Sequence, residues 1–195
     1  AIVAPGVGLK EGLLLELADK HFHTWDATGA SESVLDACVR LGRRYRFDEA
    51  HGERVATFAS ILFDATAEQH KLGARERLLL RAAAWLHDVG DFVRYDGHHK
   101  HTYYIVQNSD VVGLTATERA VVANVARYHR KSLPAVDHPN FRALEKDDRA
   151  RVRTLAAILR IADALDREHL GKVQRVSASV QGSKLVLELA GSADR

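Results

Sequence analysis

Apolar residues recur every three or four positions along most of the chain, which is the period of a helix that buries one face. Between residues 48 and 70, this stripe consists of Val55, Phe58, Ala59, Leu62 and Phe63. Similar stripes run through residues 31–44, 75–88, 115–129 and 147–166. The pattern therefore predicts a mainly α-helical protein.

Capping and turn-forming residues indicate where two of these helices begin and end. Gly90 directly follows one stripe, and glycine is common just after a helix because it tolerates positive φ. His87 and Asp88 would then lie in the last helical turn. Thr115 and Glu118 have the spacing of a capping box, which predicts the start of the next helix.

The second half of the chain contains one interruption and one change of period. Pro134 and Pro139 are incompatible with regular helix around them and predict a loop. Asp147 or Asp148 can cap the helix that follows. Residues 173–190 then alternate between apolar and polar side chains on both sides of the sequence QGS, which is typical of a β-hairpin.

These elements suggest a helical domain at residues 31–170 and a β-hairpin appendage at residues 171–195. The start of the chain differs from both, because APGVGLKEGLLLEL combines three glycines and a proline with a short apolar helix. We expect residues 1–30 to be a junction. The predicted fold class is mainly α, a helical bundle with a C-terminal β-hairpin.

The composition is ordinary for a globular protein apart from its histidines. A formal net charge of +2 in 195 residues implies no general affinity for nucleic acid or membranes. The single cysteine, Cys38, excludes an internal disulfide framework. No apolar stretch approaches the roughly 18 residues of a membrane span or has the flanks of a signal peptide, so we expect a cytoplasmic protein. The 11 histidines exceed what packing requires.

Candidate metal ligands occur near the ends of several predicted helices. They are His51, His87, Asp88, His101, His129 and Asp163. Imidazole and carboxylate groups bind borderline and hard divalent cations, and a carboxylate such as Asp88 can bridge two of them. His98 or His99 could take the place of His101, because spacing alone does not rank them. A histidine at a helix C-terminus can also simply stabilise the helix dipole, but the complete series favours a metal site.

The order of these residues resembles a known superfamily. The chain resembles the HD-domain superfamily of metal-dependent phosphohydrolases at His51, at the sequence LHDVG and at the sequence RIADALDR. A more specific resemblance is to the C-terminal part of the exopolyphosphatase and guanosine pentaphosphate phosphohydrolase family, Ppx/GppA. It rests on the sequences GHHKHTYYIVQNSD and VARYHRK and on the leading GVGLKEGLL. This second resemblance covers nearly the whole chain.

The resemblance implies an HD-domain-like helical bundle and assigns roles to the candidate ligands. The core ligands of the superfamily fall on His51, His87, Asp88 and Asp163, and members with two metals use further histidines, which match His101 and His129. The cofactor would be one or two divalent ions chosen from Mg²⁺, Mn²⁺, Fe²⁺, Zn²⁺ and Ni²⁺. Asp88 would be the catalytic residue that orients or bridges them.

The resemblance also implies a longer protein. In the Ppx/GppA family the main phosphatase site lies in an N-terminal pair of actin-like domains, and GVGLKEGLL resembles the end of that part. We therefore expect residues 1–30 to lead out of an actin-like domain that precedes this chain. The expected substrate is inorganic polyphosphate or a guanosine polyphosphate, namely guanosine pentaphosphate.

Basic residues near the candidate ligands could form a groove for a phosphate chain. Arg127, Arg130 and Lys131 surround His129 in the sequence, and Lys100 lies within GHHKH. Guanidinium groups bind phosphate oxygens in a bidentate manner, so we expect these four residues to bind phosphate. Basic residues at helix ends are also commonly a solvated face.

One position departs from the wider HD pattern. Many HD phosphohydrolases carry a lysine directly after the glycine of the HD motif, where it helps to hold a phosphate, whereas this chain has Asp91. A carboxylate there would repel phosphate, which argues against hydrolysis but not against metal binding. Two other hypotheses stay open: a non-catalytic module that binds polyphosphate or forms a homodimer, and a free-standing HD nucleotide phosphohydrolase.

Overall fold

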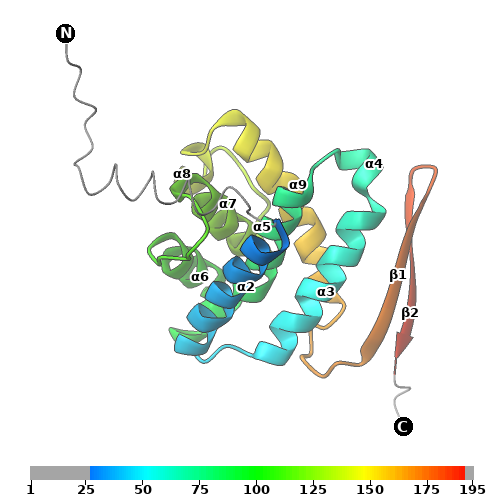
Figure 1. The fold of residues 1–195 in the computed structure, drawn as a ribbon, viewed down its shortest axis with the longest axis horizontal. Coiled ribbons are helices and arrows are strands. Elements are labelled where there is room, and N and C mark those ends of the chain that lie inside the picture. Colours follow the sequence, from blue (N-terminus) through cyan, green and yellow to red (C-terminus); the bar gives the residue numbers. More distant parts are fainter. Residues whose placement is uncertain (1–26, 192–195) are drawn as a thin grey trace.

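The computed structural model describes residues 27–191, in which helices form the body of the molecule and a β-hairpin stands beside it (Figure 1). In chain order, the elements are α2 (Ala27–Arg44), α3 (Glu49–Ala65), α4 (Ala67–His70), α5 (Ala74–Leu86), the 3-10 helix η1 (Val89–Phe92), α6 (His98–Gln107), α7 (Ala116–Arg127), α8 (Pro139–Arg142), α9 (Lys146–Ala164), β1 (Val173–Gln181) and β2 (Lys184–Gly191). The expected fold class, mainly α with a C-terminal β-hairpin, is confirmed.

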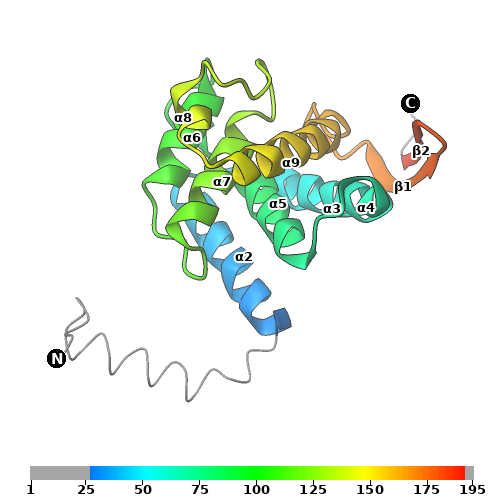
Figure 2. The same ribbon diagram turned by 90° about the horizontal axis from the view of Figure 1, so that it is seen from above.

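Helix α5 lies within the helical body and contacts α2, α3, α7 and α9 (Figure 2). Leu80 and Leu86 on this helix are inaccessible to solvent, as are Leu155 and Leu159 on α9. Burying a leucine side chain contributes about 1.5 to 3 kcal/mol relative to leaving it exposed. The packing therefore fixes the end of α5, from which His87 projects.

The helical pattern of residues 48–70 is divided into α3 and α4. Asp48 is the N-cap of α3, and its side chain accepts a hydrogen bond of 3.0 Å from the backbone N–H of His51. Thr66 separates the two helices, and its hydroxyl donates to the carbonyl of Leu62 at 2.7 Å. A threonine that bonds its own helix in this way competes with continued helix. The Asp48 cap also fixes His51 in the first turn of α3.

The two helix starts predicted from capping residues have different outcomes. The capping box of α7 is confirmed, because Thr115 and Glu118 each accept a hydrogen bond from the other's backbone N–H. The predicted cap of α9 is wrong, because Glu145 is the N-cap, and Asp147 and Asp148 lie in the first turn. Their negative charges still favour that end of the helix dipole.

The loop predicted after α7 covers residues 128–138 and is followed by a short helix. Pro139 was expected in the loop but occupies the first turn of α8. Proline suits this position because its missing N–H would have no partner within the helix and its φ is already helical. Phe141 of α8 is completely buried.

Gly90 is required for close packing and not for the end of a helix. It lies in η1, and its φ is not positive, so the role expected from the sequence is wrong. A Cβ atom at this position would lie 2.2 Å from the carbonyl oxygen of His98 and 2.5 Å from the backbone nitrogen of Thr102. The glycine therefore lets η1 touch α6, which brings the start of α6 close to the end of α5.

The predicted β-hairpin is confirmed. Strands β1 and β2 are antiparallel and are joined by residues 182–183, with Gln181 paired to Lys184. Gly182 has a φ of 62°, which two-residue hairpin turns require and glycine adopts easily. Val176 and Ala178 of β1 pack against the helical core, and β1 contacts α3 (Figure 1).

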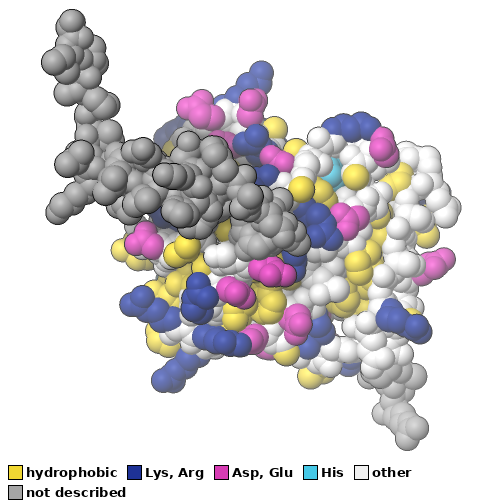
Figure 3. Space-filling model, in the orientation of Figure 1, with side chains coloured by type: hydrophobic (Ala, Val, Ile, Leu, Met, Phe, Trp, Pro, Cys, Tyr) yellow, Lys and Arg dark blue, Asp and Glu magenta, His cyan; other side chains and the backbone are white. Residues whose placement is uncertain are grey.

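Residues 1–26 and 192–195 lie outside the described residues, and with them the expected N-terminal helix and most of the expected junction at residues 1–30. Between residues 27 and 191, no helix combines the length and the apolar character needed to cross a membrane. On the face shown in Figure 3, Lys and Arg side chains are interspersed with Asp and Glu side chains, which agrees with the small net charge of +2.

Candidate metal centre

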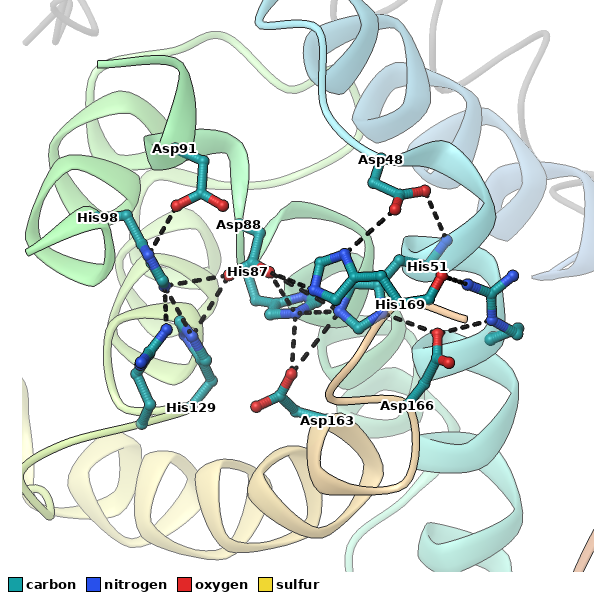
Figure 4. A network of polar contacts seen from close by, with 12 residues as sticks. Asp48, His51, His87, Asp88, Asp91, His98, His129, Asp163, Asp166 and His169 are labelled. Carbon is teal, nitrogen blue, oxygen red and sulfur yellow. Dashed lines mark hydrogen bonds and ion pairs between the residues drawn. The ribbon is translucent and has the colours of Figure 1, made fainter. Parts of the chain in front are cut away.

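Segments far apart in the chain bring histidine and aspartate side chains together in one cluster (Figure 4). They are His51 in the first turn of α3, His87 and Asp88 at the end of α5, His98 at the start of α6, His129 just after α7, and Asp163 in the last turn of α9. The four imidazoles are buried, with exposed fractions between 1% and 3%.

The imidazoles face each other in two pairs, a first pair formed by His51 and His87 and a second pair formed by His98 and His129. The Nε2 atoms of His51 and His87 are 3.1 Å apart. The Nε2 atoms of His98 and His129 are 3.2 Å apart. Each pair therefore directs the same ring atom into a shared space.

Backbone carbonyls define the tautomer of two of these histidines. The Nδ1 atom of His87 lies 2.7 Å from the carbonyl oxygen of Ala84, and that of His129 lies 2.6 Å from the carbonyl oxygen of Ala126. A carbonyl oxygen can only accept, so Nδ1 donates in both rings. In the neutral imidazole, Nε2 then presents a lone pair to the shared space.

Carboxylates orient the other two histidines. The Nδ1 atom of His51 donates to Asp166 at 2.9 Å. The Nδ1 atom of His98 lies 2.7 Å from the carboxylate of Asp91 and 3.0 Å from the carbonyl oxygen of Tyr95. Asp91 thus orients a buried imidazole, a role that the sequence did not suggest. Hydrogen bonds donated from Nδ1 in this way are typical of histidines that bind metals through Nε2.

Asp88 lies between the two pairs and turns one oxygen toward each. Its Oδ2 is 3.3 Å from Nε2 of His87 and 3.7 Å from Nε2 of His51. Its Oδ1 is 3.2 Å from Nε2 of His98 and 3.4 Å from Nε2 of His129. Within residues 27–191, this buried Oδ1 accepts no hydrogen bond.

Asp163 adds a second carboxylate to the first pair only. Its Oδ1 lies 3.5 Å from Nε2 of His87 and 3.7 Å from Nε2 of His51. The donors consequently form two groups that share Asp88. One contains His51 and His87, and the other contains His98 and His129.

This donor set fits divalent cations. Each pair needs a proton or a cation between its two Nε2 atoms, and a buried carboxylate oxygen without a hydrogen bond is costly. A cation within each pair would satisfy both, since neutral imidazole and carboxylate are accepted by Zn²⁺, Mn²⁺, Fe²⁺ and Ni²⁺. The two oxygens of Asp88 suit a carboxylate that bridges two cations.

The carboxylates control the charge of the first pair. Burial lowers the pKa of His87, but Asp88 and Asp163 outweigh burial and hold that pKa well above its ordinary value. Burial raises the pKa of Asp88, but His87 and His98 hold it well below its ordinary value. Asp163 shows the same balance, with hydrogen bonds to His51 and His87 lowering its pKa. Both carboxylates are therefore ionised.

The second pair is asymmetric. Burial lowers the pKa of His98, but its contacts with Asp88 and Asp91 raise it to about 9. Burial and the charge of His87 lower the pKa of His129 to about 3, so this imidazole is neutral near pH 7. Neutral imidazole and ionised carboxylate are the forms that bind a metal.

The structure brings five of the six expected ligands together and places His98, not His101, beside them. His101 is half-buried on α6, and within residues 27–191 it has no hydrogen bond, ion pair or ring contact with the cluster. His98 was the alternative that spacing left open. The contact of Gly90 with the His98 carbonyl places His98 beside Asp88.

Two residues that the sequence did not single out as site residues also lie at the cluster. Asp166 accepts hydrogen bonds from Nδ1 of His51 at 2.9 Å, from Nε of Arg54 at 2.6 Å and from the backbone of Gly171 at 2.8 Å. His169 stacks on the ring of His51. Both follow Asp163 within ADALDREH, but their roles depend on the conformation of the connection between α9 and β1.

Three of the four expected phosphate-binding residues lie around His99. Burial lowers the pKa of His99 to about 4, and the positive charges of Arg127, Lys100 and Arg130 contribute. Lys131 is exposed and is not among the charges that act on His99. We call Lys100, Arg127 and Arg130, whose charges act on His99 next to His98, the basic cluster.

Arg130 extends this basic cluster to the edge of the candidate site. Its Nη1 atom lies 3.5 Å from Nε2 of His98. Its guanidinium carbon lies 5.7 Å from the centre of the Tyr95 ring, a distance at which a cation is attracted to the ring face. A phosphate bound near the second pair would meet this guanidinium.

Fold and site together define a mainly α-helical protein in which two buried histidine pairs flank one shared carboxylate. Residues 36–193 match the family model of the Ppx/GppA phosphatase, domain III. This match covers most of the chain. The chain therefore belongs to the Ppx/GppA phosphatase family, which confirms the resemblance of its sequence to that family.

Similar proteins carry the name guanosine-5'-triphosphate,3'-diphosphate pyrophosphatase. The protein from Photobacterium profundum is 28% identical over 186 residues, which are 94% of this chain and 35% of the relative. The protein from Vibrio cholerae is 29% identical over 98% of this chain and 36% of the relative. The protein from Aeromonas hydrophila is 31% identical over 94% of this chain and 36% of the relative. The chain thus spans little more than a third of the length of these curated relatives.

Proposed function

We propose that this chain is an HD-type metal-binding module of a phosphohydrolase that cleaves phosphoanhydride bonds. One observation carries the proposal, namely the convergence of four imidazole Nε2 atoms on the two oxygens of Asp88. Membership of the Ppx/GppA phosphatase family supports phosphoanhydride hydrolysis as the reaction. The cofactor in this proposal is one or two ions of Mg²⁺, Mn²⁺, Fe²⁺, Zn²⁺ or Ni²⁺.

The residues of the module have separate tasks in this proposal. A divalent cation activates water and neutralises charge on a phosphoryl group that is being transferred. His51, His87 and Asp163 would hold the first cation, His98 and His129 the second, and Asp88 both. The acceptors at each Nδ1 keep the Nε2 atoms directed into the site, so that little reorganisation is needed on binding.

The proposed substrate is guanosine pentaphosphate or inorganic polyphosphate. The names of the similar proteins support the guanosine compound. In this proposal, Lys100, Arg127 and Arg130 would bind phosphate oxygens beyond the second pair, because guanidinium and ammonium groups donate to such oxygens. Both substrates contain several linked phosphates, so this contact does not distinguish them.

We also propose that this module works together with an actin-like domain that precedes it in the whole protein. The chain spans 35% or 36% of the length of the similar proteins, which leaves room for such a domain. The same fact favours a second candidate function, a module that binds polyphosphate without hydrolysing it. Phosphate release by this chain alone, with Mn²⁺ present, would separate the two functions.

Metal analysis of the purified chain tests the proposal directly. After loading with Mn²⁺ and removal of free metal, we expect one or two equivalents in the natural sequence. Asp88→Ala should lose most of this metal, because both positions need its carboxylate, and His87→Ala should lose one equivalent. Asp64→Ala is the matched control, since Asp64 pairs with Arg77 at the surface. Metal content in the natural sequence no higher than in Asp88→Ala would refute the proposal.

A further inference from the structure

His169 occupies the connection between α9 and β1 in an unusual backbone conformation. Its φ is 58°, a left-handed value that costs a residue with a Cβ free energy and that is often kept for a function. The backbone is held on both sides, because its N–H donates to the carbonyl of Asp166 at 2.8 Å and its carbonyl accepts from Arg54 at 3.3 Å. The loop therefore fixes where this imidazole points.

The ring of His169 is oriented toward the candidate metal centre. Its Nδ1 lies 3.1 Å from the carboxylate of Asp48, which is also the N-cap of α3. Its Nε2 lies 3.7 Å from Oδ2 of Asp88, the same distance as Nε2 of His51. The side chain of His169 is 35% exposed, whereas that of His51 is 1% exposed. His169 is thus the imidazole of this cluster that a ligand in solution can reach.

Stacking argues against His169 as a ligand of the first cation. The rings of His51 and His169 lie 3.6 Å apart and are inclined by only 10°. An imidazole binds a metal in its own ring plane, at about 2.1 Å from the nitrogen. A cation held by His51 in its ring plane would lie outside the plane of His169, because the two rings are stacked. The Nε2 atom of His169, which lies 3.7 Å from Oδ2 of Asp88, can therefore contact another group at the open side of the site.

We infer that His169 contacts the substrate, donating a hydrogen bond from Nε2 to an oxygen of a phosphoryl group bound at the first pair. Asp48 accepts from Nδ1 and holds the ring in place. The ligand is an inorganic or nucleoside oligophosphate, whose anionic oxygens accept hydrogen bonds from N–H groups. The inference rests on the proposed function, because the phosphoryl group is drawn there by the cation. It adds a residue on the side of the site opposite the basic cluster.

Binding of Mn²⁺ and of inorganic tripolyphosphate to the 195-residue chain tests the inference by calorimetry. His169→Gly removes the imidazole and suits the left-handed backbone, and His169→Asn provides a second variant that tolerates this conformation. His70→Gln is the matched control, because His70 of α4 packs on Phe63 of α3 and does not lie at the site. Circular dichroism melting establishes that each variant is folded.

We expect both His169 variants to keep the Mn²⁺ affinity of the natural sequence and to bind tripolyphosphate about 10- to 100-fold more weakly, the factor expected for one hydrogen bond to a charged group. Unchanged tripolyphosphate affinity, with Mn²⁺ still bound, would overturn the inference and leave the proposed function intact. A tenfold loss of Mn²⁺ affinity would also overturn it, because His169 would then be a ligand. Failure of the natural sequence to bind Mn²⁺ would overturn both.

Discussion

Each buried histidine of the candidate site is oriented by a hydrogen bond at Nδ1. Three of the acceptors are backbone carbonyls, those that face His87, His129 and His98, and they require no special side chain. The carboxylate of Asp166 accepts from His51, and the carboxylate of Asp91 forms an ion pair of 2.7 Å with Nδ1 of His98. Because these carboxylates act through an imidazole, their replacement should change metal affinity without removing a ligand.

Asp166→Ala tests this role. The change removes the acceptor for Nδ1 of His51 and the 2.6 Å partner of Arg54, so we expect the affinity for Mn²⁺ to fall by about 10- to 100-fold. Calorimetric titration measures the loss, and Asp166→Asn should recover part of it, because the amide oxygen still accepts. Asp64→Ala controls for the loss of a surface carboxylate. Equal Mn²⁺ affinity in Asp166→Ala and the natural sequence would contradict the assignment.

His98 and His101 give opposite expectations although they share one short helix. His98→Ala should reduce the bound Mn²⁺ by one equivalent, because Nε2 of His98 is 3.2 Å from both Asp88 and His129. His101→Ala should leave the metal content unchanged, since His101 lies outside the cluster. Elemental analysis of both variants provides the comparison. Loss of metal in His101→Ala alone would restore the ligand that the sequence suggested first.

At the scale of secondary structure, the sequence predicts local features better than contacts between elements. The capping box of α7 depends on residues 115–118 alone, so its pattern was sufficient. Histidines 98 and 101 are three residues apart and lie on neighbouring faces of α6, so spacing could not rank them. The contact between Gly90 and the start of α6 decides in favour of His98. No periodicity within one helix contains that information.

Glu118 links the start of α7 to α5 and should contribute measurably to stability. Its carboxylate accepts from Nε of Arg75 at 2.6 Å and from the backbone N–H of Thr115 at 2.9 Å. We expect Glu118→Gln to lower the free energy of unfolding by about 1 to 2 kcal/mol at pH 7, measured by urea denaturation. Glu49→Gln is the control, because the pair of Glu49 with Arg43 is exposed and should contribute little.

The contribution of Glu118 should also depend on pH. Hydrogen bonds donated by Arg75 are the main reason that the pKa of Glu118 is lowered from its ordinary value to about 2. A depressed pKa in the folded state stabilises the protein above the unfolded pKa, and this stabilisation is lost as the pH falls toward the folded pKa. The stability difference between the natural sequence and Glu118→Gln should therefore be constant above about pH 5 and shrink between pH 4.5 and 2. A difference that grows on acidification would contradict the pKa shift.

At the scale of the whole molecule, the candidate site exists only because five segments meet around the end of α5. The identities of His51, His87, Asp88, His129 and Asp163 could be predicted, because imidazole and carboxylate at helix ends are visible in the sequence. The contributions of Asp166 and His169 could not, since they depend on how the connection from α9 turns toward β1. That turn brings Asp166 to Arg54 of α3, more than a hundred residues away in the chain.

In the proposed function, a bound metal would link distant parts of the fold, so its binding should stabilise the whole chain. A ligand that binds only the folded state adds about 2.7 kcal/mol when present at 100 times its Kd, and for a chain of this size each kcal/mol raises Tm by about 2 to 4 °C. We therefore expect Mn²⁺ to raise the Tm by roughly 5 to 10 °C in calorimetric melting and EDTA to reverse the rise. Asp88→Ala should be folded but insensitive to Mn²⁺, whereas His70→Gln should respond like the natural sequence. An equal response of Asp88→Ala would mean that the stabilising cation binds elsewhere.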